Sequence, residues 1–174
     1  MTSSPVVMRK TTEADLPDVM AIIGLARQTM SELGFTQWSE GYPSEELIAS
    51  DIARGVSYVL VDHDNRVLAT QVVSFDEEPA YDTIERGQWN YPGAYATVHR
   101  VAVHPEQRGR GLAKLLLAEA ERVARDAQVA VMRADTHEAN QPMRRVLDHA
   151  GFRQCGHITL GSRGSRVAYE KALQ

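Results

Sequence analysis

The sequence lacks several features that mark particular classes of protein. It has one cysteine, Cys155, so the chain cannot form an internal disulfide. Residues 1–10 lack the apolar core of a signal peptide, and no apolar run approaches the length needed to span a membrane. These absences predict a cytoplasmic protein with no membrane partner. Cys155 itself lies in an alternating apolar segment, which is typical of a buried structural thiol.

Positive charge is not in excess either. The net charge of −4 argues against a general electrostatic attraction to nucleic acid or to anionic lipids. Hydrophobic residues make up 43% and charged residues 24% of the chain, which are ordinary values for a globular protein. The 174 residues suit one domain with a sizeable core. Any basic site in this acidic chain is therefore local, and its ligand is predicted to be small.

Hydrophobic periodicity and turn signals predict an alternation of strands and helices. Strands are expected at residues 6–9, 57–61, 67–75, 95–103, 129–134, 152–158 and 166–171. Helices are expected after the capping residue Asp15, from Ser44 to Gly55, from Leu112 to Ala127 and from Asn140 to Gly151. Residues 34–42 and 76–94 are expected to be loops.

The most informative stretch is residues 95–125, where an alternating strand leads through a loop into an amphipathic helix. Side chains alternate across a strand, so His99, Val101 and Val103 are expected on one face and Ala102 on the other.

The loop carries two glycines and two arginines. Gly109 and Gly111 have no side chain to keep a ligand from the backbone, and unpaired amides at a helix start form an anion site. Arg108 and Arg110 add positive charge beside those amides. The loop therefore predicts binding of a phosphate or pyrophosphate, although glycine pairs also occur in strand-to-helix turns that bind nothing.

Two known phosphate-binding patterns fit poorly. A Walker-type loop needs lysine and then serine or threonine directly after its last glycine, whereas Leu112, Ala113 and Lys114 follow Gly111. A dinucleotide fingerprint needs glycine or alanine where Lys114 stands, so that pattern is only weakly supported.

A third pattern fits well. Arg108, Gly111 and Ala113 form the sequence arginine, two residues, glycine, one residue, alanine, directly after the strand and turn at residues 101–105. This resembles the acetyl-CoA-binding motif of the GNAT superfamily of N-acetyltransferases. The resemblance covers nearly the whole chain, because the predicted order of elements is that of a GNAT domain. It implies a single domain (1–174) of the α/β (α+β) class, with a mixed, mostly antiparallel central sheet flanked by helices.

The resemblance also implies a set of cofactor-binding residues and no metal. The backbone amides of the loop would enclose the CoA pyrophosphate, and the strand would pair with the pantetheine arm. Asn140 resembles the family asparagine near the pantetheine or acetyl end, and it can also serve as a plain helix cap. The predicted cofactor residues are Val101, Ala102, Val103, Arg108, Gly109, Arg110, Gly111, Leu112, Ala113, Lys114 and Asn140.

By the same resemblance, an acceptor amine attacks the thioester directly, without an acyl-enzyme. The amine must be neutral, and the developing negative charge needs a donor, for which a backbone N–H near Val101 is the candidate. His99 is the leading general base, directly or through a water, because an ordinary imidazole titrates near pH 6.5. A histidine that only bonds to a neighbouring strand is the alternative, and Glu78 is the second candidate base.

One position departs from the family. Many members place a tyrosine that protonates the departing thiolate where this chain has Leu147. Tyr91, Tyr95 or a water could serve instead, since releasing a thiolate near neutral pH costs only about 2 kcal/mol relative to the thiol.

The acceptor is less defined. Residues 76–94 combine acids with aromatics on an irregular segment, which fits equally a solvated excursion and an acceptor pocket. The candidate acceptor-binding residues are Trp38, Tyr42, Tyr81, Trp89 and Tyr95, each of which could instead be packing. The acceptor is a small amine or a peptide or protein amine, and the acids favour a small cation.

Two further alternatives stay open. A CoA-binding regulatory module without turnover would explain Leu147, and a nucleotide-binding protein would also use the loop. The histidines outside the strand show no metal-ligand spacing, and the last strands offer an edge for a homodimer.

Overall fold

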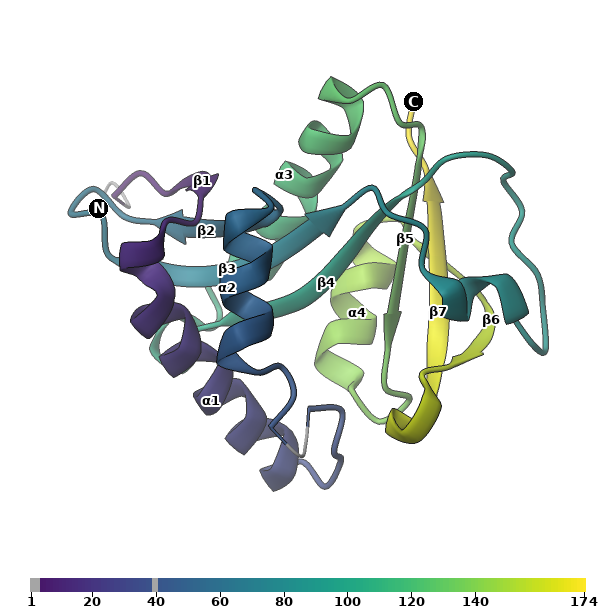
Figure 1. Cartoon of the computed structure of the whole chain (residues 1–174), viewed down its shortest axis with the longest axis horizontal. Helices are drawn as coiled ribbons and strands as arrows, with labels where there is room; N and C mark the ends of the chain where they lie inside the picture. Colours follow the sequence, from purple (N-terminus) through teal and green to yellow (C-terminus); the bar gives the residue numbers. More distant parts are fainter. Residues whose placement is uncertain (1–3, 39–40) are drawn as a thin grey trace.

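The computed structural model describes residues 4–38 and 41–174, and in these ranges seven strands form one sheet with helices on both faces (Figure 1). The strands are β1 (Val7–Lys10), β2 (Ser57–Val61), β3 (Val67–Ser74), β4 (Ala96–Val103), β5 (Val131–Thr136), β6 (Arg153–Thr159) and β7 (Ser165–Ala172). The helices are α1 (Leu16–Glu32), α2 (Glu45–Ala53), α3 (Leu112–Asp126) and α4 (Gln141–His149). The 3₁₀ turns are η1 (Glu13–Asp15), η2 (Pro79–Thr83), η3 (Pro105–Gln107) and η4 (Gly161–Arg163). Part of the loop expected at 34–42 lies outside the described residues.

The strand order is β1-β2-β3-β4-β5-β7-β6, and β4 with β5 is the parallel pair in an otherwise antiparallel sheet. The predicted mixed, mostly antiparallel sheet is confirmed. Two adjacent parallel strands need a crossover connection, and α3 provides it. In the described ranges, no helix is long and apolar enough to cross a bilayer.

The two faces of the sheet are covered by different helices. α1 and α2 lie on the face toward the viewer in Figure 1, and α3 and α4 lie behind. The apolar stripe of α1, including Val19, Ile22 and Ile23, packs on β2 and on Ala102 of β4. The stripes of α3 and α4 pack on the other face, where Leu117 and Leu147 are fully buried against β4 and β5. This periodic burial is what specifies the helices.

The helix caps follow the sequence at two of the three predicted positions. The side chains of Ser44 and Asn140 accept hydrogen bonds from backbone N–H groups at the starts of α2 and α4, at 3.1 and 3.3 Å.

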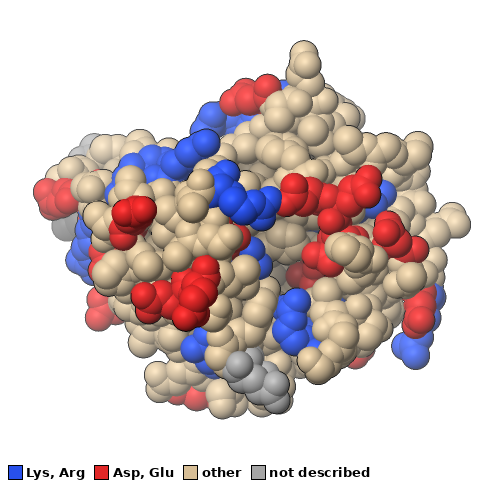
Figure 2. Space-filling model, in the orientation of Figure 1, with Lys and Arg blue, Asp and Glu red and all other residues tan. Residues whose placement is uncertain are grey.

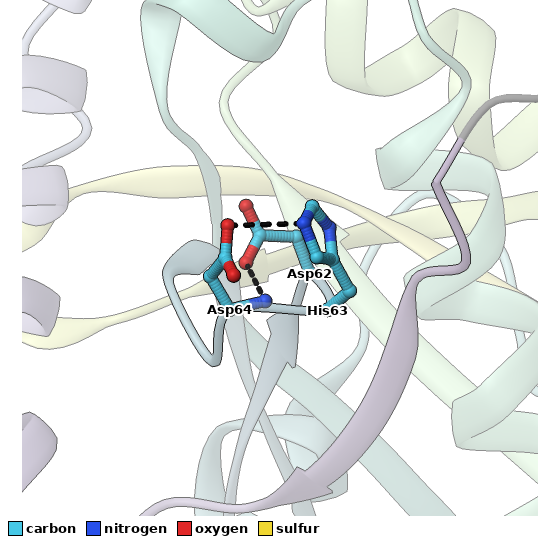
Figure 3. A group of neighbouring side chains, drawn as sticks. All are labelled: Asp62, His63 and Asp64. Carbon is cyan, nitrogen blue, oxygen red and sulfur yellow. Dashed lines mark hydrogen bonds and ion pairs between the residues drawn. The ribbon is translucent and has the colours of Figure 1, made fainter.

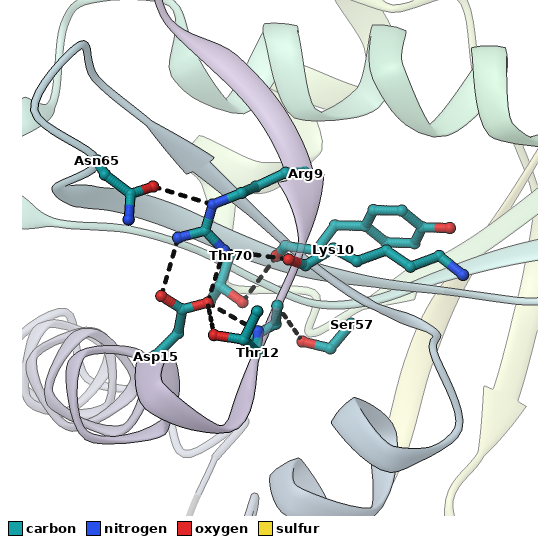
Figure 4. Close-up of polar contacts among 9 residues, drawn as sticks. Arg9, Lys10, Thr12, Asp15, Ser57, Asn65 and Thr70 are labelled. Atoms are coloured by element: carbon teal, nitrogen blue, oxygen red, sulfur yellow. Dashed lines mark hydrogen bonds and ion pairs between the residues drawn. The ribbon is translucent and has the colours of Figure 1, made fainter.

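Asp15 stands at the N-cap position of α1, as expected, but its side chain makes no capping hydrogen bond to that helix. Thr12 is the N-cap of the preceding turn η1, and the Asp15 carboxylate accepts from the Thr12 N–H at 2.8 Å, in a capping box. Arg9 of β1 holds the same carboxylate through two hydrogen bonds of 2.7 and 3.0 Å (Figure 4). The pKa of Asp15 falls to about 2, mainly because of the Arg9 hydrogen bond. The contact with Arg9, which joins β1 to this turn, could not be predicted from the local pattern around Asp15.

The turn between β2 and β3 brings together Asp62, His63 and Asp64 (Figure 3). The Asp62 carboxylate accepts from the backbone N–H groups of Asp64 and Arg66, both at 3.0 Å, and His63 lies 3.0 Å from the Asp64 carboxylate. These contacts stabilise the hairpin turn, and they account for the grouping without a ligand.

The segment at residues 76–94 is attached to the sheet rather than solvated along its length. Its Trp89 ring and the Tyr95 ring lie on either side of the Arg133 guanidinium, each centroid 4.2 Å from it. Arg133 pairs with buried Glu170 at 3.2 Å, and Glu170 also accepts from the N–H of Asn90 at 2.8 Å. The far half of the segment is therefore a structural clamp across β5 and β7.

Candidate active site

A cavity of about 1010 Å³ lies where β4 and β5 separate. The two strands pair only through Ala96 with Met132 and Thr97 with Arg133, and beyond these residues they diverge. The cavity is lined by the outer parts of both strands, by the loop before α3, by the start of α4 and by residues of α1 and α2. Its volume is at the upper end of the range for small-molecule sites.

One end of the cavity is the predicted anion site. Gly109, Gly111 and the first residues of α3 line it, and the backbone N–H groups of residues 109–114 have no hydrogen-bond partner among the described residues. Both glycines have left-handed backbones, with φ of 78° and 74°. A Cβ added at either would meet no atom within 4 Å, so the space beside this backbone is open to a ligand.

Charge around this loop is positive. Arg108 and Lys114 line the cavity, and the Arg108 guanidinium donates to the Thr29 hydroxyl at 2.9 Å. Arg110 does not line it, because its guanidinium turns back to the Gln107 side chain. A run of unpaired amides at a helix start, backed by two cations, fits a diphosphate.

The cavity also exposes one edge of β4. Residues 98–103 pair with β3 on one side, and on the other side no strand pairs with them within the described chain. Val101, Ala102 and Val103 line the cavity, so an extended ligand arm could pair with their main chain.

A bulge interrupts β4 at the middle of this edge. Val72 of β3 pairs with His99 and Thr70 pairs with Ala102, so Gln71 lies opposite both Arg100 and Val101. Arg100 has a φ of 53°, which is rare for a residue with a side chain.

The bulge overturns one prediction from the sequence. His99 was expected to share a face with Val101 and Val103. These valines pack on the α3 side of the sheet, as Val98 does, whereas His99 directly follows Val98 and so lies on the opposite side. The extra residue at Arg100 reverses which side chains of β4 face each side of the sheet. The position of this extra residue is set by the pairing with β3, which the local sequence does not show.

His99 lies half-buried in the cavity lining. Burial, followed by the charges of Arg100 and Arg163, lowers the pKa of its imidazole to about 4. The imidazole is therefore neutral at neutral pH and can accept a hydrogen bond or a proton, but it is a weaker base than the ordinary imidazole that the sequence predicted. The Arg100 guanidinium forms an ion pair with Asp51 at 2.8 Å and donates a hydrogen bond to the Tyr42 hydroxyl at 3.1 Å.

Among the carboxylates that line the cavity, Glu78 comes from the segment after β3 and Asp135 from β5. Glu78 caps η2 by accepting from the Ala80 N–H at 3.2 Å. Asp135 of β5 accepts from the Tyr81 hydroxyl at 2.7 Å, and burial is the main cause that raises its pKa. Neither has an ion-pair partner in the described part of the chain. The sequence reasoning missed Asp135, because the strand was expected to end at Ala134; a carboxylate at the end of a strand parallel to the cofactor strand is the signal that could have found it.

The predicted acceptor residues fall into two groups. Trp38 and Tyr42 line the cavity. Tyr81, Trp89 and Tyr95 do not, and they pack together, with the Tyr81 ring centroid 5.1 Å from that of Trp89 and 5.9 Å from that of Tyr95. Tyr95 and Tyr81 still reach the site indirectly, since their hydroxyls bond to the Glu78 N–H and to Asp135.

Asn140 and its neighbours close the cavity beside α4. Asn140 lines it and donates to the Gln37 side chain at 3.1 Å, which also accepts from Thr136 and from the His137 N–H. Leu147 is fully buried in the core and does not line the cavity, where Met143 and Val146 stand instead.

Comparison with known proteins agrees with this geometry. The sequence model of the acetyltransferase (GNAT) family matches residues 27–152. Among solved structures, a GNAT-family acetyltransferase from Streptococcus agalactiae 2603 is 31% identical with a TM-score of 0.88, over 97% of this chain and 96% of that chain. No curated protein sequence matches the chain.

More distant structures share the fold. A GNAT-family acetyltransferase from Listeria monocytogenes 4b F2365 is 17% identical with a TM-score of 0.73, over 98% of both chains. The PaiA N-acetyltransferase from Thermoplasma acidophilum, solved in complex with coenzyme A, is 17% identical with a TM-score of 0.70, over 97% of this chain and 99% of that chain. Because the family match spans most of its length and the Streptococcus agalactiae protein aligns nearly end to end, this chain belongs to the acetyltransferase (GNAT) family.

Proposed function

We propose that the chain is an acetyl-CoA-dependent N-acetyltransferase, which transfers the acetyl group to the amine of a small molecule or peptide. One observation carries the proposal: a single cavity joins six unpartnered backbone N–H groups at the start of α3 to the free edge of β4. A diphosphate with a long amide-containing arm is the ligand class that uses both features. Family membership supports the same cosubstrate.

The residues that would hold acetyl-CoA follow from this geometry. The amides of residues 109–114 would bind the pyrophosphate, with Arg108 and Lys114 adding charge. The main chain of Val101 and Val103 would pair with the pantetheine amides, and Asn140 would contact the arm near the strand gap. When bound, acetyl-CoA supplies an acetyl group activated as a thioester.

The bulge in β4 could supply a backbone N–H that binds the negative charge developing on the acetyl carbonyl oxygen. A bulged residue is left out of the ladder, so an N–H near Val101 is free to face the cavity. A backbone donor fixed by the fold needs no reorganisation when charge develops on the carbonyl oxygen.

His99 is the proposed general base. Its lowered pKa keeps it neutral, so it can take the proton that the acceptor nitrogen releases as it bonds to the acetyl carbon, directly or through a water. Glu78 remains the second candidate, and Asp135 joins it as a carboxylate that can hold a cationic amine before transfer.

Protonation of the departing thiolate is not assigned to a tyrosine at the family position, because Leu147 lies in the core. Releasing a thiolate costs only about 2 kcal/mol near neutral pH, so water can serve.

A calorimetric titration tests the cosubstrate. We expect acetyl-CoA and CoA to bind the wild-type protein, and Gly111→Val to abolish binding, because a side chain would enter the space beside the amides. Gly93→Val is the matched control: Gly93 also has a positive φ, of 93°, and lies outside the cavity lining. Unchanged binding by Gly111→Val, or competition of NAD or ATP for the site, would contradict the proposal.

A CoA-binding regulatory module without turnover is the second candidate. The burial of Leu147 is the observation that favours it. A panel of amines with detection of released thiol separates the two functions, because a module would bind CoA and release no thiol with any amine.

A further inference from the structure

Beyond the strand gap the cavity contains unpaired charges of both signs. Acidic side chains gather over the segment that follows β3, and basic side chains lie across the hollow from them (Figure 2). The acids that line the cavity here include Asp135 and Glu78, and the bases include Arg163 and Arg166. Glu78 directly precedes η2, Asp135 lies in β5, and Arg163 and Arg166 lie close together in η4 and β7, so the fold gathers them from three separate stretches of the chain.

Arg163 is held in place without an anion. Its guanidinium stacks on the Tyr42 ring, 3.9 Å from the ring centroid, and it forms no ion pair or side-chain hydrogen bond with the described residues. Stacking fixes the plane of the guanidinium and leaves the N–H groups at its edge available, which is the arrangement that binds a carboxylate in two places.

Arg166 strengthens this positive region. It is only 3% exposed, and it donates to the backbone carbonyl oxygens of Arg163, Ser165 and Gln37 at 2.8 to 3.2 Å. Carbonyl oxygens satisfy its hydrogen bonds but do not cancel its charge; the Asp135 carboxylate acts on it electrostatically but forms no ion pair with it among the described residues.

Arg100, in contrast, lines the same cavity and is neutralised by Asp51 at 2.8 Å. The two arginines near η4 therefore keep a net positive field, which an anionic ligand would complete.

The carboxylates of Asp135 and Glu78 form a negative region opposite the two arginines. Asp135 accepts a hydrogen bond from the Tyr81 hydroxyl. Neither carboxylate has a cationic group within 4 Å among the described residues. Both acids therefore have room for a cationic group from a ligand.

The register of the sheet determines how far Asp135 lies from Arg166. Asp135 pairs with Ala168, so Arg166 is its diagonal neighbour on the same face of β5 and β7. The backbones of diagonal neighbours lie roughly 7–8 Å apart, so the side chains of Asp135 and Arg166 are close enough to contact two groups of one small molecule.

Building on the proposed function, we propose that the acceptor is a small amino acid-like molecule, whose amine lies at Asp135 and Glu78 and whose anionic group is bound by Arg163 and Arg166. A plain cationic amine would leave the arginines unpaired. A protein or peptide amine would place a neutral amide where the structure offers guanidinium groups.

The test compares matched acceptors on matched variants. Each amino acid is assayed beside its primary amide, whose amine is less basic, and its decarboxylated amine, whose amine is more basic, so that amine basicity is bracketed. Thiol release gives kcat and KM for wild type, for Arg163→Gln and for Arg153→Gln. Arg153 is an exposed arginine of β6 outside the cavity lining, and its variant is the control.

We expect wild type and Arg153→Gln to prefer the acid over both comparators by at least about 10-fold in kcat/KM, as for a hydrogen bond to a charged group. Arg163→Gln should remove this preference by raising KM for the acid, with kcat changed little. Equal use of acid and amide by wild type, an unchanged preference in Arg163→Gln, or acceptance of peptides alone would overturn the inference and leave the proposed function standing.

Calorimetry on the CoA-loaded protein keeps the inference testable without turnover. Binding of the amino acid but not of its amide, lost in Arg163→Gln, would support the inference even if no thiol were released. Binding of none of the three compounds would overturn it.

Discussion

His99 links the stability of this protein to its proposed chemistry, and one substitution tests both. Its pKa falls from an ordinary 6.5 to about 4, first because of burial and then because of the charges of Arg100 and Arg163. At about 1.4 kcal/mol per pH unit, this lowering corresponds to about 3 kcal/mol of free energy of unfolding.

The sign of the effect follows from proton uptake. Above pH 6.5 His99 is neutral in the folded and the unfolded chain, and its effect on stability is constant. Between pH 6.5 and 4 the unfolded chain binds a proton that the folded chain does not, so stability falls as the pH falls. Below about pH 4 both forms are protonated and the loss stops.

Urea denaturation of wild type and His99→Gln measures this effect. The difference in free energy of unfolding between the two proteins should move by about 3 kcal/mol in favour of the variant between pH 7.5 and 4, because glutamine does not titrate. His149→Gln, at an exposed position of α4, is the control, because it makes the same replacement of histidine by glutamine outside the core.

The same variant tests the proposed base. At pH 7.5 His99→Gln should lower kcat by about 100-fold, as for loss of a general base, while CoA affinity stays unchanged. Because the His99 pKa is lowered to about 4, wild-type kcat/KM should not fall near pH 6.5 through protonation of His99. A difference in stability that is constant with pH would refute the burial argument, and wild-type kcat in the variant would refute the role as base.

Three further predictions concern buried polar groups. Asp15→Asn should cost about 2 kcal/mol of unfolding free energy at pH 7, because Arg9 lowers the pKa of Asp15 to about 2; in urea denaturation that cost should shrink as the pH falls from about 4 to 2, and a pH-independent cost would contradict it. Asp51→Asn should destabilise by about 3 kcal/mol, since it leaves Arg100 half-buried and unpaired, and a thermal shift below about 3 °C would contradict this. Cys155, whose pKa burial raises to about 11, should react with a thiol reagent at pH 7.5 only in denaturant, and fast reaction of the folded protein would disprove its burial.

The parts of the fold that the sequence predicts are those in which local chemistry decides. The stripe of α3, including Leu116 and Ala120, is periodic and buried as expected. Ser44 and Asn140 cap their helices because a cap needs only a polar side chain and the next few amides. The open glycine loop at the start of α3 could be predicted for the same reason, since its glycines and the helix start are contiguous in the chain; anion binding by this loop stays a prediction.

The features that the sequence did not reveal depend on contacts between distant segments. The bulge at Arg100 exists because Val72 and Thr70 fix the register of β4 from the neighbouring strand. Arg163 matters because the hairpin after β6 brings it to Tyr42, more than a hundred residues earlier in the chain. Local patterns contain no information on such pairings.

The placement of the site follows from the one parallel pair in the sheet. Parallel neighbours must be joined by a crossover, and α3 therefore starts at the carboxyl end of β4, while α4 starts after the carboxyl end of β5. Both helix starts thus lie at the end where the strands separate, and there the first N–H groups of α3 have no partner among the described residues. An antiparallel neighbour in place of β5 would run back along β4, pair with its free edge and fill the gap. The proposed binding of an extended ligand here therefore depends on topology, and the bulge at Arg100 and the charges near η4 determine which groups that ligand would meet.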